Sequence, residues 1–273
     1  MEPLNTEEFY FMQKFILEKT GITIDEDKRY LVDSRMAEVI NVFNISSLKE
    51  LVNRLKNDRQ NILHQMVIES ITTHETSFFR DIHPFECLAN IVLPELIKER
   101  RKERALNIWC AACSSGQEPY SIAILIHEKF PEILNWKINI IASDISREML
   151  ARVSEGAFNE IEINRGLTRE IINKYFVMCA NEWIINRQIK KMVSTCEINL
   201  LDDWYGVPPM DLIFLRHVLI YFNLDVKKNI LRKIKRNLKK DGYLLLGVGE
   251  TTSNVDDSFE GVLLNKSLFY RMK

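Results

Sequence analysis

Apolar residues recur at helical spacing through the first seventy residues of the chain. This spacing predicts a helix that begins after a cap at Thr6 and ends at Gly21. Its apolar face consists of Phe9, Met12, Phe15 and Ile16. A second helix is expected from about residue 25 to 43. Its inward side chains are expected to be Leu31, Val39 and Ile40. A capping box at 47–50 precedes a third helix, and a fourth lies around 62–67. The pattern predicts a small all-helical domain.

The pattern changes after about residue 104, where short apolar runs alternate with amphipathic segments. The strands predicted from these runs are 106–109, 138–142, 211–215 and 243–248. The helices predicted between them are 118–130, 146–155 and 225–238. Such alternation requires right-handed crossovers and produces a mainly parallel sheet. Two final short strands, 262–264 and 268–270, predict an antiparallel hairpin at the sheet edge. The fold class predicted for this part is α/β.

One stretch, about residues 158–195, interrupts this alternation. It contains a helix capped at Thr168 and short strands around 183–185 and 192–194. We interpret the stretch as a small antiparallel β-subdomain inserted into the sheet domain. The predicted organisation is a helical domain at 1–72, a linker and connecting helix at 73–104, and the α/β domain at 105–273.

Composition and charge narrow the class of protein. The chain has 273 residues, 46% of them hydrophobic, and a formal net charge of -1, so nothing in it favours nucleic acid or a membrane surface as partner. No apolar run reaches the length of a membrane span, and the chain opens in an acidic helical stretch without a signal-peptide pattern. Five cysteines without framework spacing indicate a reduced, cytoplasmic protein, which we expect to be a monomer.

A loop of small residues, 111–121, follows the first strand of the α/β domain. The topology places it at the carboxyl end of the sheet, where open α/β folds bind ligands. It contains neither G-x-G-x-x-G nor a Walker motif, so a pyrophosphate cofactor is not expected. Glu118 would repel phosphate but attract a cationic ligand such as S-adenosylmethionine. The alternative is an ordinary turn between a strand and a helix.

Asp144 ends the second predicted strand. A carboxylate at this position can accept hydrogen bonds from both hydroxyl groups of a ribose. The alternative is that it caps the helix that begins at about Ser146.

Five segments together resemble the chemotaxis receptor methyltransferases of the CheR type. Residues 72–81, TTHETSFFRD, resemble the family signature TTNETxFFRD. The remaining resemblances are the loop ending in SSGQEPYS, the segment ASDI at 142–145, NLL at 199–201 and FLRHVLIYF at 214–222. Gly242 to Thr251 also matches the family's final core strand. The motifs stand in the family's order and cover nearly the whole chain.

The resemblance implies a Rossmann-like S-adenosylmethionine methyltransferase core with an all-helical N-terminal domain and an inserted β-subdomain. The cofactor would be S-adenosyl-L-methionine and the product S-adenosyl-L-homocysteine. The cofactor-binding residues implied are His74, Thr76, Arg80, Gln117, Glu118, Asp144, Asn199, Leu200, His217 and Val218. Thr76 and Arg80 would hold the methionine carboxylate, with the Arg80 guanidinium as a charge-assisted fork. Asp144 would bind the ribose, and Asn199 and Leu200 would flank the adenine.

The resemblance also assigns the centre of the reaction. The corner formed by Gln117 and Glu118 would face the amino group and the sulfonium, and His217 and Val218 would line the methionine portion. Arg80 and Tyr221 are the candidate catalytic residues, because their motifs face the reaction centre and either could orient the incoming carboxylate. No metal ion is expected.

Two histidines depart from the family pattern, since His74 and His217 stand where the family usually has Asn. Neutral imidazole offers one donor and one acceptor, as an amide does, but it is bulkier and titrates near pH 6.5. The change could therefore weaken cofactor binding or make it dependent on pH, or it could be harmless; we expect binding to be retained. Gln117 replaces one of two glutamates of some members, and Glu118 keeps one carboxylate.

The implied acceptor is a glutamate on the cytoplasmic helical bundle of a methyl-accepting chemotaxis receptor. Lys28, Arg29 and Arg35, on the second predicted helix, are expected to bind this substrate, although the segment MAEVI at 36–40 interrupts the basic charge and weakens steering by this face. The loop at 175–183 is short and lacks glycine. Members of the family that grip a C-terminal receptor peptide have a longer loop with glycine there, so no pentapeptide tether is expected. The alternatives are a non-catalytic or cofactor-sensing CheR-like signalling module, and a methyltransferase for a different protein acceptor.

Two further patterns have simpler interpretations. Cys110 and Cys113 form a C-x-x-C, but no second pair accompanies them, so a metal or redox site is not expected. The lysines and arginines between 227 and 240 are interpreted as the solvated face of an amphipathic helix.

Overall fold

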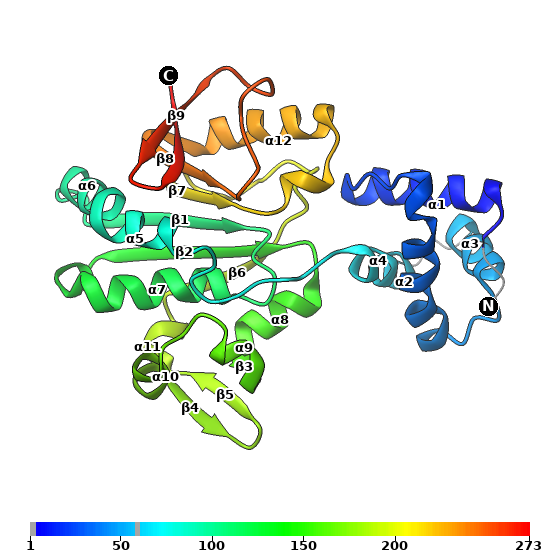
Figure 1. Cartoon of the computed structure of the whole chain (residues 1–273), viewed down its shortest axis with the longest axis horizontal. Helices are drawn as coiled ribbons and strands as arrows, with labels where there is room; N and C mark the ends of the chain where they lie inside the picture. The colour runs from blue at the N-terminus through cyan, green and yellow to red at the C-terminus, as the bar shows by residue number, and fades with distance from the viewer. Residues whose placement is uncertain (1–3, 58–60) are drawn as a thin grey trace.

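The computed structural model describes residues 4–57 and 61–273 of the chain. A helical domain, an extended linker and a sheet domain follow one another along the chain (Figure 1). The arrow of strand β1 (Ala105–Ala111) points towards the helical domain, so the carboxyl edge of the sheet faces that domain (Figure 1). None of the helices in the described residues is long and apolar enough to span a bilayer.

In its described residues, 4–57 and 61–71, the helical domain contains four α-helices and one 3₁₀ turn. They are α1 (Thr6–Thr20), η1 (Glu26–Lys28), α2 (Arg29–Val42), α3 (Leu48–Asn57) and α4 (Asn61–Ile71). The cap of α1 is Asn5 and not Thr6, because Asn5 Oδ1 accepts from the Glu8 amide and the Glu8 carboxylate accepts from the Asn5 amide, both at 2.9 Å. Gly21 ends α1 in the left-handed conformation, as predicted.

The core of this domain confirms most of the predicted helix faces. Phe9, Met12, Phe15 and Ile16 are all buried. On α2 the buried residues are Val32, Met36, Val39 and Ile40. The prediction for Leu31 was wrong: its side chain is 39% exposed. The buried stripe of α2 follows the 3.6-residue period through Val32, and Leu31 lies one residue, or about 100°, off that stripe.

The linker from Thr72 leads into a helical connection that packs on the sheet. It consists of α5 (His83–Cys87), the π-helical turn η2 (Leu88–Val92) and α6 (Leu93–Glu99). In Figure 1 the linker is the extended cyan segment that runs from α4 across the sheet domain to α5.

A seven-stranded mixed sheet forms the centre of the larger domain. Besides β1 its strands are β2 (Lys137–Asp144), β6 (Val193–Glu197), β7 (Met210–Leu215), β8 (Leu238–Leu246), β9 (Phe259–Leu264) and β10 (Ser267–Met272). Their order is β6-β2-β1-β7-β8-β10-β9. The first five are parallel, and β10 runs antiparallel to β8 and β9. This confirms the predicted α/β fold and its edge hairpin.

Helices cover both faces of the sheet because its strands are apolar on both sides. On one face Ile108 and Cys110 pack with helices α7 (Gln117–Lys129) and α8 (Arg147–Glu155) and with the α5–α6 connection. On the other face their neighbours Trp109 and Ala111 pack with α12 (Leu224–Asn237). Short 3₁₀ turns η3 (Pro131–Ile133) and η4 (Leu219–Tyr221) complete the domain.

The inserted subdomain is a separate three-stranded antiparallel sheet of order β3-β5-β4. Its elements are β3 (Ala157–Phe158), α9 (Glu160–Asn164), α10 (Arg169–Tyr175), β4 (Phe176–Cys179), β5 (Glu182–Ile185) and α11 (Arg187–Lys190). Thr168 caps α10 as predicted. The strand predicted at 192–194 does not belong to this subdomain: it is the start of β6, which pairs with β2 at the edge of the main sheet.

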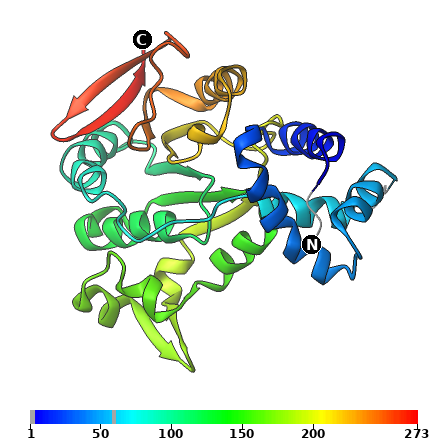
Figure 2. The same ribbon diagram turned by 45° about the vertical axis from the view of Figure 1, so that its right-hand side comes forward.

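The strand order determines where a ligand can bind. From β1 the chain crosses to β2 on one side and later returns to β7 on the other side. The loops after β1 and β7 therefore diverge and leave a crevice at the carboxyl edge of the sheet. The helical domain lies beside this edge in both views (Figures 1 and 2).

Candidate active site

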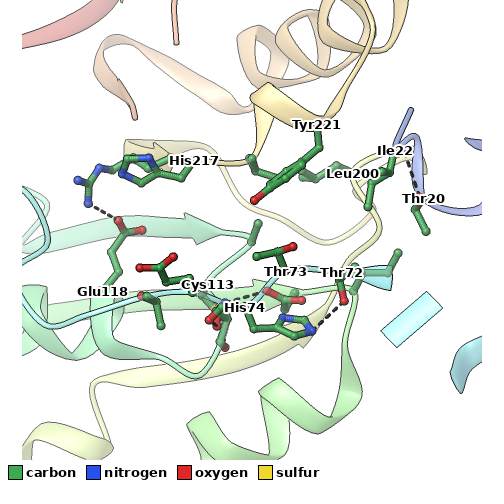
Figure 3. A pocket seen from close by; sticks show the side chains of 18 of the residues that line it. Thr20, Ile22, Thr72, Thr73, His74, Cys113, Glu118, Leu200, His217 and Tyr221 are labelled. Carbon is green, nitrogen blue, oxygen red and sulfur yellow. Dashed lines mark hydrogen bonds and ion pairs between the residues drawn. The ribbon is translucent and has the colours of Figure 1, made fainter. Parts of the chain in front are cut away.

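A pocket with about 970 Å³ of space, open solvent at its mouth included, lies in this crevice (Figure 3). Ten of the predicted site residues line it: His74, Thr76, Arg80, Glu118, Asp144, Asn199, Leu200, His217, Val218 and Tyr221. In Figure 3, Glu118 and His217 lie at one end of the pocket, and Thr20, Ile22 and Leu200 lie at the other. The length of the pocket thus runs from charged groups to apolar ones.

The loop between β1 and α7 has a backbone shaped for close approach. Ala112, Ser114 and Gly116 all have positive φ, at 57°, 52° and 95°. A Cβ on Gly116 would lie 2.9 Å from Val153 Cγ2, so glycine is needed there for both conformation and space. The loop brings Ala112, Cys113 and Ser114 to the pocket wall.

Asp144 is held by the backbone of two loops. Its Oδ2 accepts from the Ser114 amide at 2.8 Å, and its Oδ1 accepts from the Ser146 amide at 3.0 Å. Burial raises the pKa of this carboxyl. The capping alternative was wrong, since Ser146 is the N-cap of α8 and its hydroxyl accepts from the Met149 amide.

His74 is fixed to the wall of the pocket. The Thr72 hydroxyl donates its one hydrogen to Glu69 O at 2.9 Å, and Thr72 Oγ1 lies 2.8 Å from His74 Nε2. The same hydroxyl therefore ties the His74 ring to the last turn of α4. The Ser114 hydroxyl donates to His74 O at 2.7 Å and joins the linker to the β1–α7 loop.

Arg216 is a buried cation that the sequence analysis did not identify. Its Nη1 donates to Glu118 Oε2 at 2.8 Å, and its Nη2 donates to Asp81 Oδ2 at 2.7 Å. The charge of Glu118 is therefore already compensated by a protein cation. The expectation that this carboxylate alone would attract a cationic ligand does not take Arg216 into account. Both missed residues, Arg216 and Asp81, stand within the motifs FLRHVLIYF and TTHETSFFRD.

His217 occupies a strained backbone position. Its φ is 57°, in the left-handed region that Asn, Asp and His enter more readily than other side chains. This gives a physical reason why Asn and His can replace each other at this position. Its Nε2 lies 3.1 Å from Asp81 Oδ2, and its amide donates to Glu250 Oε2 at 2.8 Å. Like the ring of His74, its ring is held by a neighbour at the side of the pocket.

The helical domain closes the apolar end of the pocket. The side-chain amide of Asn199 donates to Lys19 O at 2.7 Å, across the domain boundary. Ile22 forms a bridge with Phe222, and the Thr23 amide donates to Tyr221 O at 3.1 Å. Residues from both domains therefore enclose this end.

A buried ammonium group supports the same end. Lys233 Nζ donates to three backbone carbonyls, those of Leu200, Leu201 and Asp202, at 2.6, 2.9 and 2.7 Å. Its burial lowers its pKa. Lys233 is 6% exposed, so the interpretation of the basic residues of α12 as a solvated face was wrong at this position.

Four predicted site residues lie elsewhere. Gln117 is buried outside the pocket wall and accepts from the Ser115 hydroxyl at 2.9 Å. Arg35 Nη1 donates to the carbonyls of Ser70 and Thr72, at 3.1 and 2.9 Å, so it holds the end of α4. Arg29 lies over the ring of Phe9, with 4.7 Å from its Cζ to the ring centroid. Lys28 is exposed and pairs with Asp25.

The two cysteines of the C-x-x-C are buried free thiols. Burial raises the pKa of both, so neither is a reactive thiolate. Within residues 4–57 and 61–273, no cluster of three or more His, Cys, Asp or Glu side chains has a geometry suited to a metal ion.

Comparisons with known proteins agree with the motifs. The family model described as "CheR methyltransferase, SAM binding domain" matches residues 74–267, and "CheR methyltransferase, all-alpha domain" matches residues 7–72. The chain is 40% identical over 266 residues to chemotaxis protein methyltransferase 1 of Pseudomonas aeruginosa, covering 95% of this chain and 96% of that protein. It is 38% identical to chemotaxis protein methyltransferase Cher2 of Pseudomonas putida, covering 97% and 98%.

A third relative, chemotaxis protein methyltransferase 1 of Vibrio cholerae, is 34% identical to this chain. The match covers 99% of this chain and 98% of that protein. These matches span both domains, and the pocket lies where the two domains meet. The chain therefore belongs to the CheR methyltransferase family and is an S-adenosylmethionine-dependent methyltransferase, as the resemblance of its motifs predicted.

Proposed function

We propose that this protein transfers the methyl group of S-adenosylmethionine to glutamate side chains of bacterial chemoreceptors, forming glutamyl methyl esters in chemotactic adaptation. The observation that carries the proposal is the long pocket at the carboxyl edge of the sheet, with Asp144 at its wall and Glu118 at one end. The relatives named as chemotaxis methyltransferases, matched over almost their whole length, support the choice of acceptor. We infer that the reaction takes place in the bacterial cytoplasm, where the receptor bundles lie.

We propose one orientation for the cofactor in the pocket. Asp144 has a buried carboxylate that already accepts two backbone amides, and each oxygen has a further lone pair for a ribose hydroxyl. The apolar end, at Leu200 and Ile22, suits the adenine ring. The opposite end suits the methionine portion: Thr76 and Arg80 would hold its carboxylate, and Glu118, His217 and Val218 would surround its amino group and sulfur.

When bound, S-adenosylmethionine supplies an electrophilic methyl group, whose transfer to a carboxylate oxygen leaves S-adenosylhomocysteine. The acceptor glutamate has a reference pKa of about 4.3 and is ionised in the cytoplasm, so the protein needs no general base. The chain's own contribution is positioning and the exclusion of water, and positioning alone can supply roughly 7–11 kcal/mol in favourable systems. Arg80 and Tyr221 are the residues proposed to orient the carboxylate; the Tyr221 hydroxyl points into the pocket (Figure 3).

Of the three basic residues proposed to contact the receptor, only Lys28, just before α2, has an exposed head group, and it pairs with Asp25 on the surface. Lys28 is exposed, whereas Arg29 and Arg35 have partners within the helical domain. We propose that the receptor bundle reaches the protein directly, without a pentapeptide tether, because the turn between β4 and β5 is short. The protein would act as a monomer.

The proposal is tested by incubating the purified protein with labelled S-adenosylmethionine and receptor signalling domains. A carboxyl methyl ester releases methanol in mild base, and a methylated amine or thiol does not. Base-labile label in a receptor glutamate peptide is the expected result. Label in another protein of the same extract, and none in receptors, would point to a different acceptor. Absence of transfer with intact cofactor binding would favour a cofactor-sensing module.

A further inference from the structure

We propose that three exposed aliphatic side chains, Ile82, Ile220 and Val248, form a rim outside the pocket on which the helix that carries the acceptor glutamate docks. These side chains are 62%, 56% and 75% exposed. They come from the linker, from the segment after β7 and from the segment after β8. The inference rests on the proposed function and specifies which surface receives the receptor.

One carboxylate brings Ile220 and Val248 together. Glu250 Oε1 accepts from the Ile220 amide at 3.2 Å, and Glu250 Oε2 accepts from the amide of Gly247, the residue before Val248, at 2.6 Å. The same Oε2 accepts from the His217 amide at 2.8 Å. The segments after β7 and β8 are thus fixed against each other by three backbone donors on one side chain.

Ile82 joins the rim through its neighbour in the chain. Asp81 Oδ2 lies 3.1 Å from His217 Nε2 and accepts from Arg216 Nη2 at 2.7 Å. The linker residue that precedes Ile82 is therefore bound to the same segment that Glu250 holds from the other side. His217 is common to both sets of contacts, and it lines the pocket at its methionine end.

The rim lies outside the pocket wall but next to it. None of its three side chains lines the pocket, whereas His217, Val218 and Tyr221, from the same segment as Ile220, all do. A glutamate side chain that enters at this end leaves its own backbone outside. The residues next to it in the receptor must therefore meet the surface that surrounds the entrance.

The backbone conformation of Ile82 supports a functional role for its exposed side chain. Phe79, Asp81 and Ile82 have φ of 49°, 70° and 49°, and a β-branched residue in this region is a genuine outlier. Such strain reduces stability and persists where the surroundings enforce it, most often at functional sites. In the free protein Ile82 gains little burial in return, since most of its side chain faces solvent.

Two carboxylates next to the rim are already paired. Asp81 is bound to Arg216, and both oxygens of Glu250 accept backbone amides. The matching partner is an α-helix that carries apolar residues three or four positions from its glutamate, on the same face of the helix.

The test uses variants of the full chain with a purified receptor signalling domain. Val248→Asp is expected to raise the KM for the receptor at least tenfold and to leave the Kd for S-adenosylhomocysteine unchanged. Ile82→Gly removes both the aliphatic group and the backbone strain, so it should raise the receptor KM while the protein unfolds at the same or a higher urea concentration. A merely structural role for Ile82 would not produce this combination.

Ile161→Asp is the matched control, because Ile161 is 81% exposed on α9, in the inserted subdomain. Its receptor KM should equal that of the wild type. Wild-type KM values in both rim variants would overturn the inference and leave the proposed function standing. An equal rise in Ile161→Asp would also overturn it, since the effect would not be specific to the rim. A wild-type protein that methylates no receptor would overturn the proposed function, and this inference with it.

Discussion

Arg216 Nη1 donates to Glu118 Oε2 over 2.8 Å at one end of the pocket, so the carboxylate nearest the proposed sulfonium position is already part of an ion pair. We predict that Glu118→Gln, which keeps the shape and removes the charge, weakens cofactor binding. A hydrogen bond to a charged group contributes about 1.5–3 kcal/mol, which corresponds to a loss of roughly ten- to hundredfold in affinity. Calorimetry with S-adenosylmethionine and with S-adenosylhomocysteine measures the loss for each.

The two ligands separate two roles of Glu118, since both carry the amino group and only the first carries the sulfonium. Equal losses would assign Glu118 to the amino group, and a larger loss for S-adenosylmethionine would assign it to the sulfonium. Asp81→Asn is the control, because Asp81 also pairs with Arg216 but does not line the pocket. An affinity loss as large in Asp81→Asn would show that the Arg216 network, and not contact with the ligand, causes the effect.

Lys233 is predicted to matter for stability and for the adenine end of the pocket together. Lys233→Met removes three donors and leaves the carbonyls of Leu200, Leu201 and Asp202 with one partner fewer. An unsatisfied buried polar group costs about 1–3 kcal/mol, so the free energy of unfolding should fall by roughly that amount or more. Urea unfolding measures the loss, and the Kd for S-adenosylhomocysteine should rise because Leu200 lines the pocket.

Lys228→Met gives the comparison on the same helix. Lys228 is exposed, and surface substitutions of this kind usually change stability by less than about 0.5 kcal/mol. A stable Lys233→Met protein with normal cofactor affinity would contradict the role assigned to the ammonium group.

The contrast between these two lysines shows which features of the structure the sequence pattern predicts and which it does not. The strands and their parallel order follow from apolar runs that alternate with helices, and the position of Asp144 at the end of β2 follows from the same pattern. Lys233 stands three residues after Ile230, at the margin of the buried stripe of α12. Its aliphatic stem allows burial, but only the fold shows that three carbonyls meet its head group.

Pairs of residues far apart in the chain were beyond any periodic signal. Arg216 and Asp81 stand 135 positions apart, and each has a plausible solvated or ligand-binding role when considered alone. The strand at 192–194 was assigned to the wrong sheet for a related reason: a short run such as β6 (Val193–Glu197) has no pattern that identifies its neighbour. The resemblance of the motifs predicted ten of the residues that line the pocket, but not the ion pairs that Glu118 and Asp81 form with Arg216.

Arg35 and Lys28 should separate cofactor binding from receptor binding. Arg35→Ala removes the charged donor that joins α2 to the carbonyls of Ser70 and Thr72, next to the linker that lines the pocket. We expect its cofactor Kd to rise by up to about tenfold, less than the full contribution of about 1.5–3 kcal/mol for a bond to a charged group, because Arg35 acts on the pocket only through the linker. Lys28→Ala leaves this contact intact and should change only the receptor KM, most clearly at low salt.

The measurements are the Kd for S-adenosylhomocysteine and the receptor KM at two ionic strengths. Unchanged cofactor affinity in Arg35→Ala would mean that the linker keeps its position without the arginine. A salt-independent receptor KM for the wild type would remove Lys28 from the docking surface.

Asp144 predicts how cofactor binding depends on pH. Burial raises the pKa of its carboxyl in the free protein, and ribose hydroxyls that donate to it would stabilise the ionised form and lower that pKa on binding. Binding should therefore release protons when the pH is near the raised pKa. Affinity is full above the pKa of the free protein and falls as the pH drops through it, because the ligand must then displace a proton. Calorimetry of S-adenosylhomocysteine in buffers of different ionisation enthalpy measures the protons released.

Asp144→Asn separates this carboxyl from the two histidines near the ligand, His74 and His217. The variant should bind more weakly at neutral pH, by about 1.5–3 kcal/mol for the loss of charge-assisted bonds, and should release no protons in the acid range. An acid dependence that persists in Asp144→Asn would show that this carboxyl is not its source and would contradict the prediction.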